Sequence, residues 1–320
     1  MESTLTTCEA EHDLIVRERT PEADDVVSLR LADPTGAPLP VWQPGAHVDL
    51  HTPVGPRQYS LTGDHRDSRV WMIAVRHEAA GRGGSAWVHE ELAPGRRVRV
   101  SGPRNHFQLE PASAYVFIAG GIGITPLHAM IRDADRQGVP WHLIYGGRTR
   151  RAMAFADELT RFGPRVEILP EDSAGLLDVE AALKRLTTGS LLYACGPEPL
   201  LDALNDLCPR TRQGQLRFER FASRTSQQSV SDHAFQVELA ESKKTITVRP
   251  GQSILRACQA AGVEVFTSCE EGICGTCETP VIDGTVEHHD SILTDREREE
   301  NATMMICVSR AQGGKLVLDL

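Results

Sequence analysis

The sequence predicts a multi-domain α/β protein made of an antiparallel β-barrel, a doubly wound parallel α/β domain and a small α+β unit. Three observations predict this architecture. Short strands of alternating apolar residues separated by Gly/Pro turns occupy 13–107, strands alternate with helical segments over 115–220, and a cysteine-rich segment follows a polar stretch at 222–232. A chain of 320 residues is long enough for three domains.

The charge and hydropathy of the chain argue against several classes of function. The formal net charge is −10 and no basic stripe stands out, which disfavours nucleic-acid binding. The longest apolar run, 114–124, contains three glycines and is shorter than the roughly 20 residues of a membrane span. The N-terminus is polar and acidic, unlike a signal peptide. We therefore expect a cytoplasmic protein, monomeric by default, without structural disulfides, membrane attachment or nucleic-acid partners.

The first block, 1–108, is expected to be the barrel. Its strands show period-2 alternation of apolar residues, and turn sequences such as DPTGAP and GRGGS separate them. The expected strands are 13–19, 26–33, 47–52, 57–62, 70–76 and 96–102.

The second block, 109–224, is expected to be the parallel α/β domain. Its apolar strands alternate with helical segments of about ten residues, which implies right-handed crossovers between parallel strands. The expected strands are 114–120, 141–147, 166–170, 190–195 and 215–220. The expected helices begin at Pro126, lie near 152–162 and 178–186, and follow Pro197.

The third block, 233–320, follows a segment of which we assign 225–232 as a linker. Two short strands, a helix near 253–261, the cysteine loop and further short strands make it a small α+β unit. The block holds 8 Lys and Arg against 14 Asp and Glu, a net charge of −6. This acidity suits docking to a basic partner surface, and it equally suits a solvated surface kept for solubility.

Four cysteines in the third block have the spacing C-x4-C-x2-C-x29-C and are Cys269, Cys274, Cys277 and Cys307. This is the spacing of plant-type [2Fe–2S] ferredoxins, with three ligands in one loop and a distant fourth. Zinc modules usually pair their ligands as two short hooks, and only one hook is present, so zinc and a thiol switch are the weaker alternatives. Glycines within the loop allow it to wrap closely and to point N–H groups at the sulfurs.

A glycine-rich turn, AGGIGITP at 119–126, joins an apolar strand to a helix. Glycine lets such a turn pass close to a pyrophosphate, which the helix N-terminus then binds. We expect Thr125 to cap this helix and Pro126 to be its first residue. The alternative is tight strand–helix packing without a ligand. The candidate binding residues are Gly120, Gly121, Gly123, Thr125 and Pro126.

A second turn at the same predicted sheet edge strengthens the case for a nucleotide. Strand 190–195 ends in Cys195, Gly196 and Pro197, and ligands of open α/β sheets bind at the carboxyl ends of the strands. Arg148 begins a basic run after strand 141–147 and is placed to reach a ribose or a phosphate, although a solvated loop explains the run equally well.

The first block also carries groups suited to a phosphate and a ring system. Arg57 offers a bidentate fork for phosphate, Tyr59 an aromatic face and Ser60 a hydrogen bond for the edge of a heterocycle. A loop of small residues before a short helix also suits phosphate. This loop comprises Gly83, Gly84 and Ser85.

In this order, the motifs RQYSL, GRGGS, SGPRNHF, GGIGITP, CGP and CEEGICGTC resemble the phthalate dioxygenase reductase family, which includes the reductase components of vanillate O-demethylase-type systems. The resemblance covers essentially the whole chain. It implies a flavin barrel of the ferredoxin reductase type, an NAD domain and a C-terminal β-grasp ferredoxin. It also implies three cofactors: FMN in place of FAD, NADH and a [2Fe–2S] cluster.

The resemblance assigns further roles residue by residue. Ala74, Val75 and Arg76 match the second strand beside the flavin ring and its ribityl chain, and Thr125 matches the position where the NAD domain reaches the flavin. The arginine-rich loop 148–151 leaves NADPH open as an alternative to NADH, since arginine also accepts a 2′-phosphate. The residues that the resemblance places near the reacting rings, our catalytic candidates, are Ser60, Cys195, Glu219 and Phe221.

The function implied by the resemblance is electron transfer. NADH delivers two electrons together and the cluster accepts one, so a flavin between them splits the pair and no general acid or base is required. The implied acceptor is the terminal component of a Rieske non-haem iron oxygenase or O-demethylase that acts on an aromatic acid. A cytochrome P450 acceptor and a free flavin reductase or NADH oxidase are the alternatives. A non-enzymatic zinc or redox-sensor module is the rival from another class, and the RQYSL and GRGGS motifs argue against it.

Overall fold

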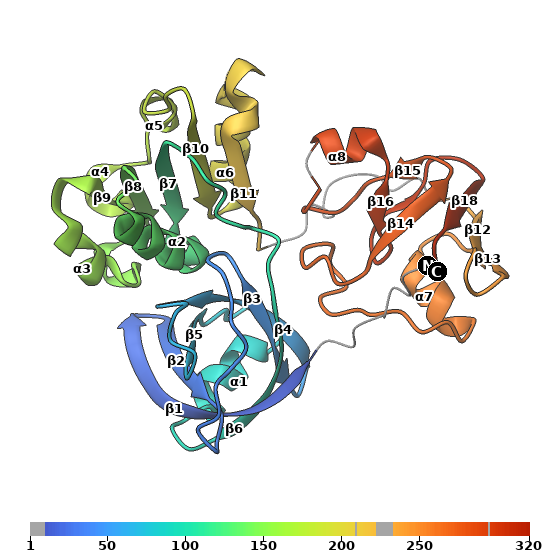
Figure 1. The fold of residues 1–320 in the computed structure, drawn as a ribbon, viewed down its shortest axis with the longest axis horizontal. Coiled ribbons are helices and arrows are strands. Elements are labelled where there is room, and N and C mark those ends of the chain that lie inside the picture. Colours follow the sequence, from blue (N-terminus) through green and yellow to red (C-terminus); the bar gives the residue numbers. More distant parts are fainter. Residues whose placement is uncertain (1–9, 209, 222–232, 294) are drawn as a thin grey trace. The chain divides into compact units, whose positions relative to one another are not determined.

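Six antiparallel strands near the N-terminus close into a barrel (Figure 1), as predicted. The computed structural model describes residues 10–208, 210–221, 233–293 and 295–320. Around the barrel the strand order is β1-β2-β5-β4-β3-β6, and β6 pairs with β1 to complete the circle. The strands are β1 (Glu11–Ala23), β2 (Val26–Ala32), β3 (His47–Thr52), β4 (Gly55–Thr62), β5 (Trp71–Arg76) and β6 (Arg97–Arg104).

Apolar side chains from several strands fill the barrel. Leu29 and Leu31 of β2 point to the same side of their strand and are fully buried, and Ile73 of β5 joins them. The helix α1 (Gly84–Glu91) contributes Val88 to the same core. The helix therefore fixes the loop that precedes it against the barrel.

A five-stranded parallel sheet follows the barrel, again as predicted, with the strand order β11-β10-β7-β8-β9. Its strands are β7 (Ala114–Gly120), β8 (Trp141–Gly147), β9 (Val166–Pro170), β10 (Ser190–Cys195) and β11 (Leu216–Glu219). The helices that connect them are α2 (Ile124–Gln137), α3 (Ala156–Leu159), α4 (Glu171–Ala174), α5 (Val179–Leu183) and α6 (Glu198–Leu207).

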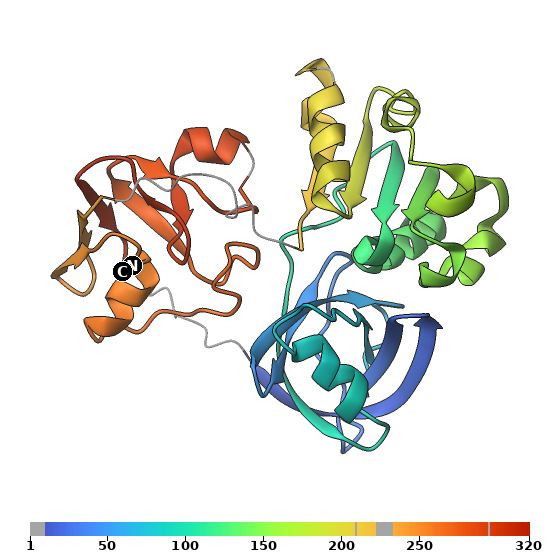
Figure 2. The ribbon, with the colours of Figure 1, turned by 180° about the vertical axis from the view of Figure 1, so that it is seen from behind.

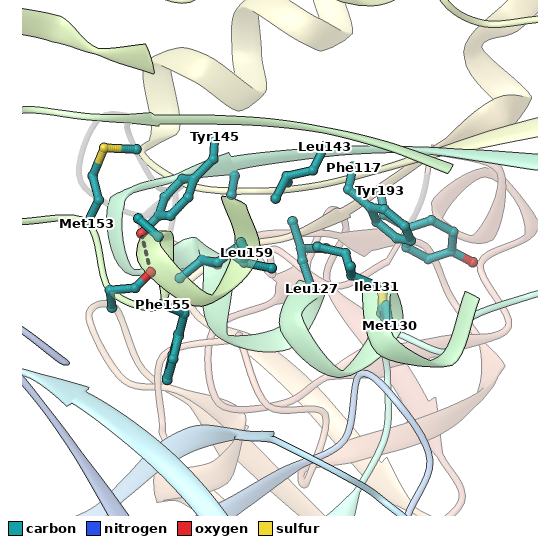
Figure 3. Packing of buried hydrophobic residues seen from close by; sticks show 14 of the residues in the cluster. Phe117, Leu127, Met130, Ile131, Leu143, Tyr145, Met153, Phe155, Leu159 and Tyr193 are labelled. Carbon is teal, nitrogen blue, oxygen red and sulfur yellow. Dashed lines mark hydrogen bonds between the residues drawn. The ribbon is translucent and has the colours of Figure 1, made fainter. Parts of the chain in front are cut away.

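Helices cover both faces of this sheet, because successive residues of its strands are apolar and point to opposite faces, so both faces must be buried. Phe117 of β7 packs with α2, and Figure 3 shows Leu127 and Ile131 of that helix against the sheet. The adjacent residue Ile118 belongs to the core on the other face, with Leu201 of α6. The arrangement is the doubly wound one expected from the sequence.

The helix α2 packs against the barrel as well as the sheet. Its Ala129 lies in the barrel core, whereas Leu127 and Met130 lie in the sheet core. Val26 and Ala74 of the barrel in turn join the sheet core. Residues 1–219 therefore form one compact unit.

The prediction of one helix near 152–162 is wrong. This segment contains only the short α3, flanked by the 3-10 turns Arg150–Ala152 and Thr160–Arg165. Phe155, just before α3, has a φ of 59°, a left-handed conformation that interrupts a helix, and Gly163 and Pro164 interrupt it again downstream.

The second compact unit, residues 220–320, is built on a mixed sheet of order β13-β12-β18-β14-β16. The helix α7 (Ile254–Ala260) packs Leu255 and Cys258 into the core of this unit. Figure 2 shows this helix, in orange, beside the strands of the same unit. The predicted β-grasp ferredoxin fold is confirmed. Its other elements are β12 (Phe235–Leu239), β13 (Lys244–Val248), β14 (Glu278–Asp283), β15 (Val286–Glu287), α8 (Asp295–Glu300), β16 (Thr303–Met305), β17 (Arg310–Ala311) and β18 (Lys315–Leu318).

The predicted domain boundaries, at 108, 224 and 232, stay predictions. The linker assigned to 225–232 lies outside the described residues. The contacts separate the chain once, between Glu219 and Arg220, and do not divide the first unit near 108. No helix within the described ranges combines the length and hydropathy of a membrane span.

Candidate functional site

Two glycine-containing turns pack against each other at one edge of the parallel sheet. The first follows β7 as the 3-10 turn Gly121–Gly123, and the second follows β10 at Gly196. A Cβ atom on Gly123 would lie 2.2 Å from the Cys195 carbonyl oxygen, and one on Gly120 would lie 2.4 Å from Pro197 Cδ. Neither position has room for a side chain, so glycine is required for the two turns to meet.

This edge is the topological switch point of the sheet. The chain runs from β7 outward through β8 and β9, then returns to the other side of β7 to form β10 and β11. In open α/β sheets the ligand binds at the carboxyl ends of the strands where the direction reverses. The structure thus brings together at one edge the predicted nucleotide residues Gly120, Gly121, Gly123, Gly196 and Pro197.

Thr125 does not cap the helix, contrary to the prediction. The N-cap of α2 is Gly123, Thr125 is the second helical residue and Pro126 the third. The Thr125 hydroxyl donates a hydrogen bond to the Ile122 carbonyl at 3.1 Å. The helical path already begins in the 3-10 turn, which moves the cap upstream. Since no side chain caps α2, its first N–H groups are available to an anion.

Cys195 and Glu219 are neighbours on adjacent parallel strands at this edge. Glu219 is half-buried as a residue, but its Oε2 atom is fully buried and has no hydrogen-bond partner among the described residues. Burial raises the pKa of Glu219 to about 8. Burial and the neighbouring Glu219 raise the pKa of the Cys195 thiol. At pH 7 the edge therefore holds a neutral acid that can donate a hydrogen bond and a thiol that is not a nucleophile.

Arg148 follows β8 at the same edge and is exposed. The next two arginines are occupied: Arg150 Nη2 lies 2.5 Å from Asp157 Oδ1, and Arg151 Nη2 lies 3.1 Å from Asp24 Oδ1 of the barrel. No such partner holds the Arg148 side chain within the described part of the chain, so Arg148 is the member of the run that is available to a nucleotide.

In the barrel, Arg57 of β4 lies across the turn that starts α1. A Cβ atom on Gly84 would lie 2.7 Å from Arg57 Cγ, so the close approach of the arginine requires glycine. Gly83, the N-cap of α1, has a φ of 91° and provides no side-chain cap. The Ser85 hydroxyl instead accepts a hydrogen bond from the Glu78 amide at 3.0 Å. The Arg57 Nη atoms donate to the Pro56 and Val54 carbonyls at 2.8 and 3.1 Å, which holds the guanidinium near the start of α1. A guanidinium near uncapped helix N–H groups fits the phosphate of a flavin.

The two strands predicted to contact the flavin separate where the candidate residues lie. β4 pairs with β5 only at Leu61–Ile73 and Thr62–Met72. Tyr59 and Ser60 on one strand, and the segment 74–76 on the other, lie beyond these pairs. Ser60 is buried, and burial raises the pKa of Tyr59 to about 12. A neutral aromatic ring and a hydroxyl beside an open strand edge suit a planar heterocycle.

The barrel and the glycine-rich turn approach each other at Arg76. A Cβ atom on Gly121 would lie 3.8 Å from Arg76 Nη1. Arg76 is exposed and its Nε atom lies 2.6 Å from Glu78 Oε1. The predicted flavin strand and the predicted pyrophosphate turn therefore meet within the first unit.

The four cysteines of the second unit are arranged as two pairs. A hydrogen bond from Cys269 lowers the pKa of Cys274 to about 5 and raises that of Cys269, and the pair Cys277 and Cys307 behaves in the same way. Within the described ranges, no three His, Cys, Asp or Glu side chains surround a single-ion position. Two cysteines on each iron is the ligand set of a [2Fe–2S] cluster, so the thiols fit that group.

The backbone around the cysteine loop supplies donors to the sulfurs. The Glu271 amide donates to Cys269 Sγ at 3.3 Å, and the Thr276 hydroxyl lies 3.2 Å from Cys274 Sγ. Gly272 has a φ of 70°, and a Cβ atom there would lie 2.6 Å from a Val308 methyl carbon. The loop thus wraps tightly and directs hydrogen-bond donors inward, as predicted.

One residue in contact with the glycine-rich turn was not predicted from the sequence. Tyr145 of β8 is fully buried, and its hydroxyl lies 3.1 Å from the Gly121 carbonyl and 3.2 Å from the Ala154 carbonyl. Figure 3 shows it beside Phe155 and Met153. Within an apolar strand, nothing distinguishes this tyrosine from a core residue. Phe221, the predicted ring near the flavin, is 42% exposed, and its contact with a cofactor stays a prediction.

Comparisons with known proteins agree with this geometry. Residues 237–312 match the family model of the 2Fe-2S iron-sulfur cluster binding domain. The chain is 41% identical to the phenoxybenzoate dioxygenase subunit beta of Ectopseudomonas oleovorans, over 93% of this chain and 94% of that protein. The solved structure of phthalate dioxygenase reductase matches with a TM-score of 0.71 and 34% identity, over 97% of this chain and 98% of that one. The chain belongs to the phthalate dioxygenase reductase family.

This reductase also resembles part of a larger protein. An intact type IV self-sufficient cytochrome P450 monooxygenase matches with a TM-score of 0.89 and 42% identity over 97% of the reductase, which spans only 41% of that longer chain. Family membership identifies the chain as an oxidoreductase of oxygenase systems with a [2Fe–2S] domain, and the related solved structure is described as transferring electrons from pyridine nucleotides to [2Fe–2S]. The residues described above fit each of these groups.

Proposed function

We propose that the reductase transfers electrons from NADH, through FMN and its [2Fe–2S] cluster, to the terminal component of a Rieske non-haem iron oxygenase or O-demethylase that acts on an aromatic compound. The observation that carries this proposal is the combination, in one chain, of a nucleotide edge facing a flavin strand and a loop with two cysteine pairs. When bound, FMN takes a hydride and releases its electrons singly.

At the sheet edge, the chain's own residues bind and orient the nicotinamide nucleotide. The N–H groups of the turn Gly121–Gly123 and the start of α2 bind the pyrophosphate. Arg148 contacts the adenosine end. The neutral Glu219 carboxyl donates a hydrogen bond to the nicotinamide amide, and the Cys195 thiol provides an uncharged surface beside it.

In the barrel, the residues of the two separated strands bind the flavin. Arg57 and the uncapped N-terminus of α1 bind the phosphate, while Tyr59 and Ser60 line the ring. Phe221, an exposed aromatic residue just after β11, is our candidate for the ring that approaches the flavin. We assign the reductase as a monomer whose acidic C-terminal unit docks to a basic surface of its acceptor.

One experiment tests the direction of electron flow. Under anaerobic conditions, NADH should bleach the flavin and cluster absorbance at about 1.5 equivalents per protein, which corresponds to two electrons at the flavin and one at the cluster. Cys274→Ser should abolish cytochrome c reduction while flavin reduction by NADH survives. Cys258→Ala, at a buried cysteine of the same unit that is not a ligand, is the control. Unchanged cytochrome c reduction in Cys274→Ser would contradict the role of the cluster.

A cytochrome P450 is the second candidate acceptor, because the self-sufficient P450 match covers 97% of the reductase. Mixing the reduced protein with a purified Rieske-type oxygenase or with a P450, and following cluster reoxidation, separates the two. Faster reoxidation by the P450 would reverse our order of preference. A free flavin reductase would instead reduce added FMN as rapidly in Cys274→Ser as in the wild type, without transferring electrons to either protein.

A further inference from the structure

A buried histidine links the flavin strand to the nucleotide helix. His128 of α2 is 1% exposed, and its Nδ1 atom lies 2.9 Å from the Thr62 hydroxyl oxygen and 3.4 Å from the Gly63 amide at the end of β4. On its other side, Nε2 lies 3.2 Å from Glu158 Oε1 of α3. One imidazole ring therefore joins three elements of the first unit.

The hydrogen-bond partners assign the role of each ring nitrogen. The Gly63 amide can only donate, so Nδ1 is an acceptor and carries no proton. Nε2 then carries the proton and donates it to the Glu158 carboxylate, which also pairs with Arg132. Each nitrogen has a fixed partner, so the ring cannot turn without losing contacts on both sides.

The distances along the chain from this ring to the proposed binding groups are short. Thr62 lies two residues after Ser60 on β4, a separation of about 7 Å. His128 lies one helical turn, about 6 Å, after the start of α2, where the glycine-rich turn packs against Cys195. Thr62 is also one of the two positions at which β4 still pairs with β5 before the strands separate.

A second connection leads from the same ring to the glycine-rich turn. Phe155 stacks on His128 with ring centroids 4.6 Å apart and holds a left-handed conformation. The carbonyl of the preceding Ala154 lies 3.2 Å from the Tyr145 hydroxyl, which is also 3.1 Å from the Gly121 carbonyl. His128 is thus tied to the nucleotide edge both along α2 and across the sheet.

We propose that His128 is a positioning residue that sets the separation of the flavin and nicotinamide rings by fixing β4 against α2. The inference rests on the proposed function, because it requires both rings to bind where described above. His128 touches neither ring. Its effect passes through Thr62 to the flavin strand and through α2 and Phe155 to the nucleotide turn. Hydride transfer is sensitive to such placement, since a misplacement of about 1 Å costs about a hundredfold in rate.

The variants are His128→Leu and Thr62→Val, and the control is His142→Leu. Thr62→Val removes one hydroxyl at nearly constant volume, so it tests the link even where His128→Leu fails to fold. His142 of β8 also contacts a glutamate, Glu167 Oε1, with its Nε2 atom at 2.9 Å, but both residues lie within the parallel sheet. His142→Leu therefore removes a histidine–glutamate pair like that of His128, but one that makes no link to the barrel.

The experiment uses the full chain loaded with FMN and cluster. Stopped-flow flavin reduction by NADH should slow about tenfold to a hundredfold in His128→Leu and at least about threefold in Thr62→Val. FMN content and the dissociation constant for NAD⁺ should stay within about twofold of wild type, as the binding groups remain. The long-wavelength absorbance of the stacked nicotinamide–flavin pair should weaken in both variants, and amide hydrogen exchange should accelerate over 55–63. His142→Leu should match the wild type.

The outcomes separate this inference from the proposed function. A wild-type protein that NADH does not bleach would overturn the proposed function and the inference with it. If the wild type is bleached but both variants reduce flavin and stack nicotinamide as it does, only the positioning role of His128 is wrong, whatever their melting temperatures. A loss in His142→Leu equal to that in His128→Leu would also overturn the inference, because it would show a general effect of stability.

Discussion

Replacing Glu219 by Gln should change how the stability of the reductase depends on pH. Glu219 Oε2 is buried without a partner among the described residues, and burial raises the pKa of this carboxyl from 4.5 to about 8. Between these values the unfolded chain has lost the proton and the folded chain retains it. Stability therefore falls as pH rises through this window in the wild type. Glutamine resembles the protonated form and has no proton to lose.

The expected magnitude follows from the width of the window. Each pH unit is worth about 1.4 kcal/mol for one proton. From pH 4.5 to about 8, the free energy of unfolding of Glu219→Gln should therefore rise relative to that of the wild type by up to about 5 kcal/mol. The buried, unpartnered amide of the glutamine has a cost of its own, but that cost does not vary with pH. The test is therefore how the difference in the free energy of unfolding between the two proteins changes with pH, and not its size at any one pH.

The assay is urea unfolding of both proteins between pH 5 and 8, followed by tryptophan fluorescence. All four tryptophans lie in residues 1–219, so the signal reports the unit that contains Glu219. Glu110→Gln is the control. Hydrogen bonding to Arg217 lowers the pKa of Glu110, so above pH 5 this substitution should lower the free energy of unfolding by an amount that does not vary with pH. If the free energy of unfolding depends on pH in the same way in the wild type and in Glu219→Gln, then Glu219 is not a neutral, unpartnered carboxyl group in the folded protein.

Two other substitutions test the packing. Gly123→Ala should destabilise the first unit by roughly 1–3 kcal/mol, because the new Cβ atom would lie 2.2 Å from the Cys195 carbonyl, whereas Gly214→Ala, in open space, should be neutral in the same urea assay. Asp49→Asn should cost about 3–5 kcal/mol, since it removes the carboxylate 2.5 Å from the buried Arg104 guanidinium. Glu11→Gln, at an exposed ion pair, should lower the free energy of unfolding by less than about 1 kcal/mol. Equal losses of stability in Asp49→Asn and Glu11→Gln would contradict the importance of the buried pair.

The strands were predictable because local rules decide them. Period-2 alternation and Gly/Pro turns placed the six barrel strands, and the strand–helix rhythm placed the five parallel ones. The cysteine spacing predicted the cluster loop for a similar reason, since four ligands at fixed separations leave little choice of geometry. Apart from the distant Cys307, these features depend on residues close together in the sequence.

The helix boundaries that failed depend on single backbone conformations. A helix over 152–162 is reasonable from composition, but Phe155 adopts a left-handed conformation in which its ring stacks on His128. Thr125 resembles a cap, but the preceding 3-10 turn starts the helical path two residues earlier. In both cases a tertiary contact or a neighbouring turn overrides the local preference.

The links between the barrel and the sheet were not predictable from one sequence. Thr62 and His128 are 66 residues apart, and each has an ordinary place in its own element. Tyr145 likewise looks like a core residue of an apolar strand. Only the packing of α2 between the two cores brings these polar groups together, where burial obliges them to pair.

The cysteines show why residue type alone does not assign chemistry in this chain. Cys195 and Cys274 are both buried, yet burial raises the pKa of the first, while hydrogen bonds to Cys269 and Thr276 lower that of the second to about 5. The surroundings of the two thiols differ: burial and the Glu219 carboxyl act on Cys195, whereas the Cys269 thiol and the Thr276 hydroxyl hydrogen-bond to Cys274. A thiol that stays protonated suits an uncharged nicotinamide surface, and thiolates suit iron. The loop path itself requires glycine, because Gly272 has a φ of 70° and a side chain there would collide with Val308.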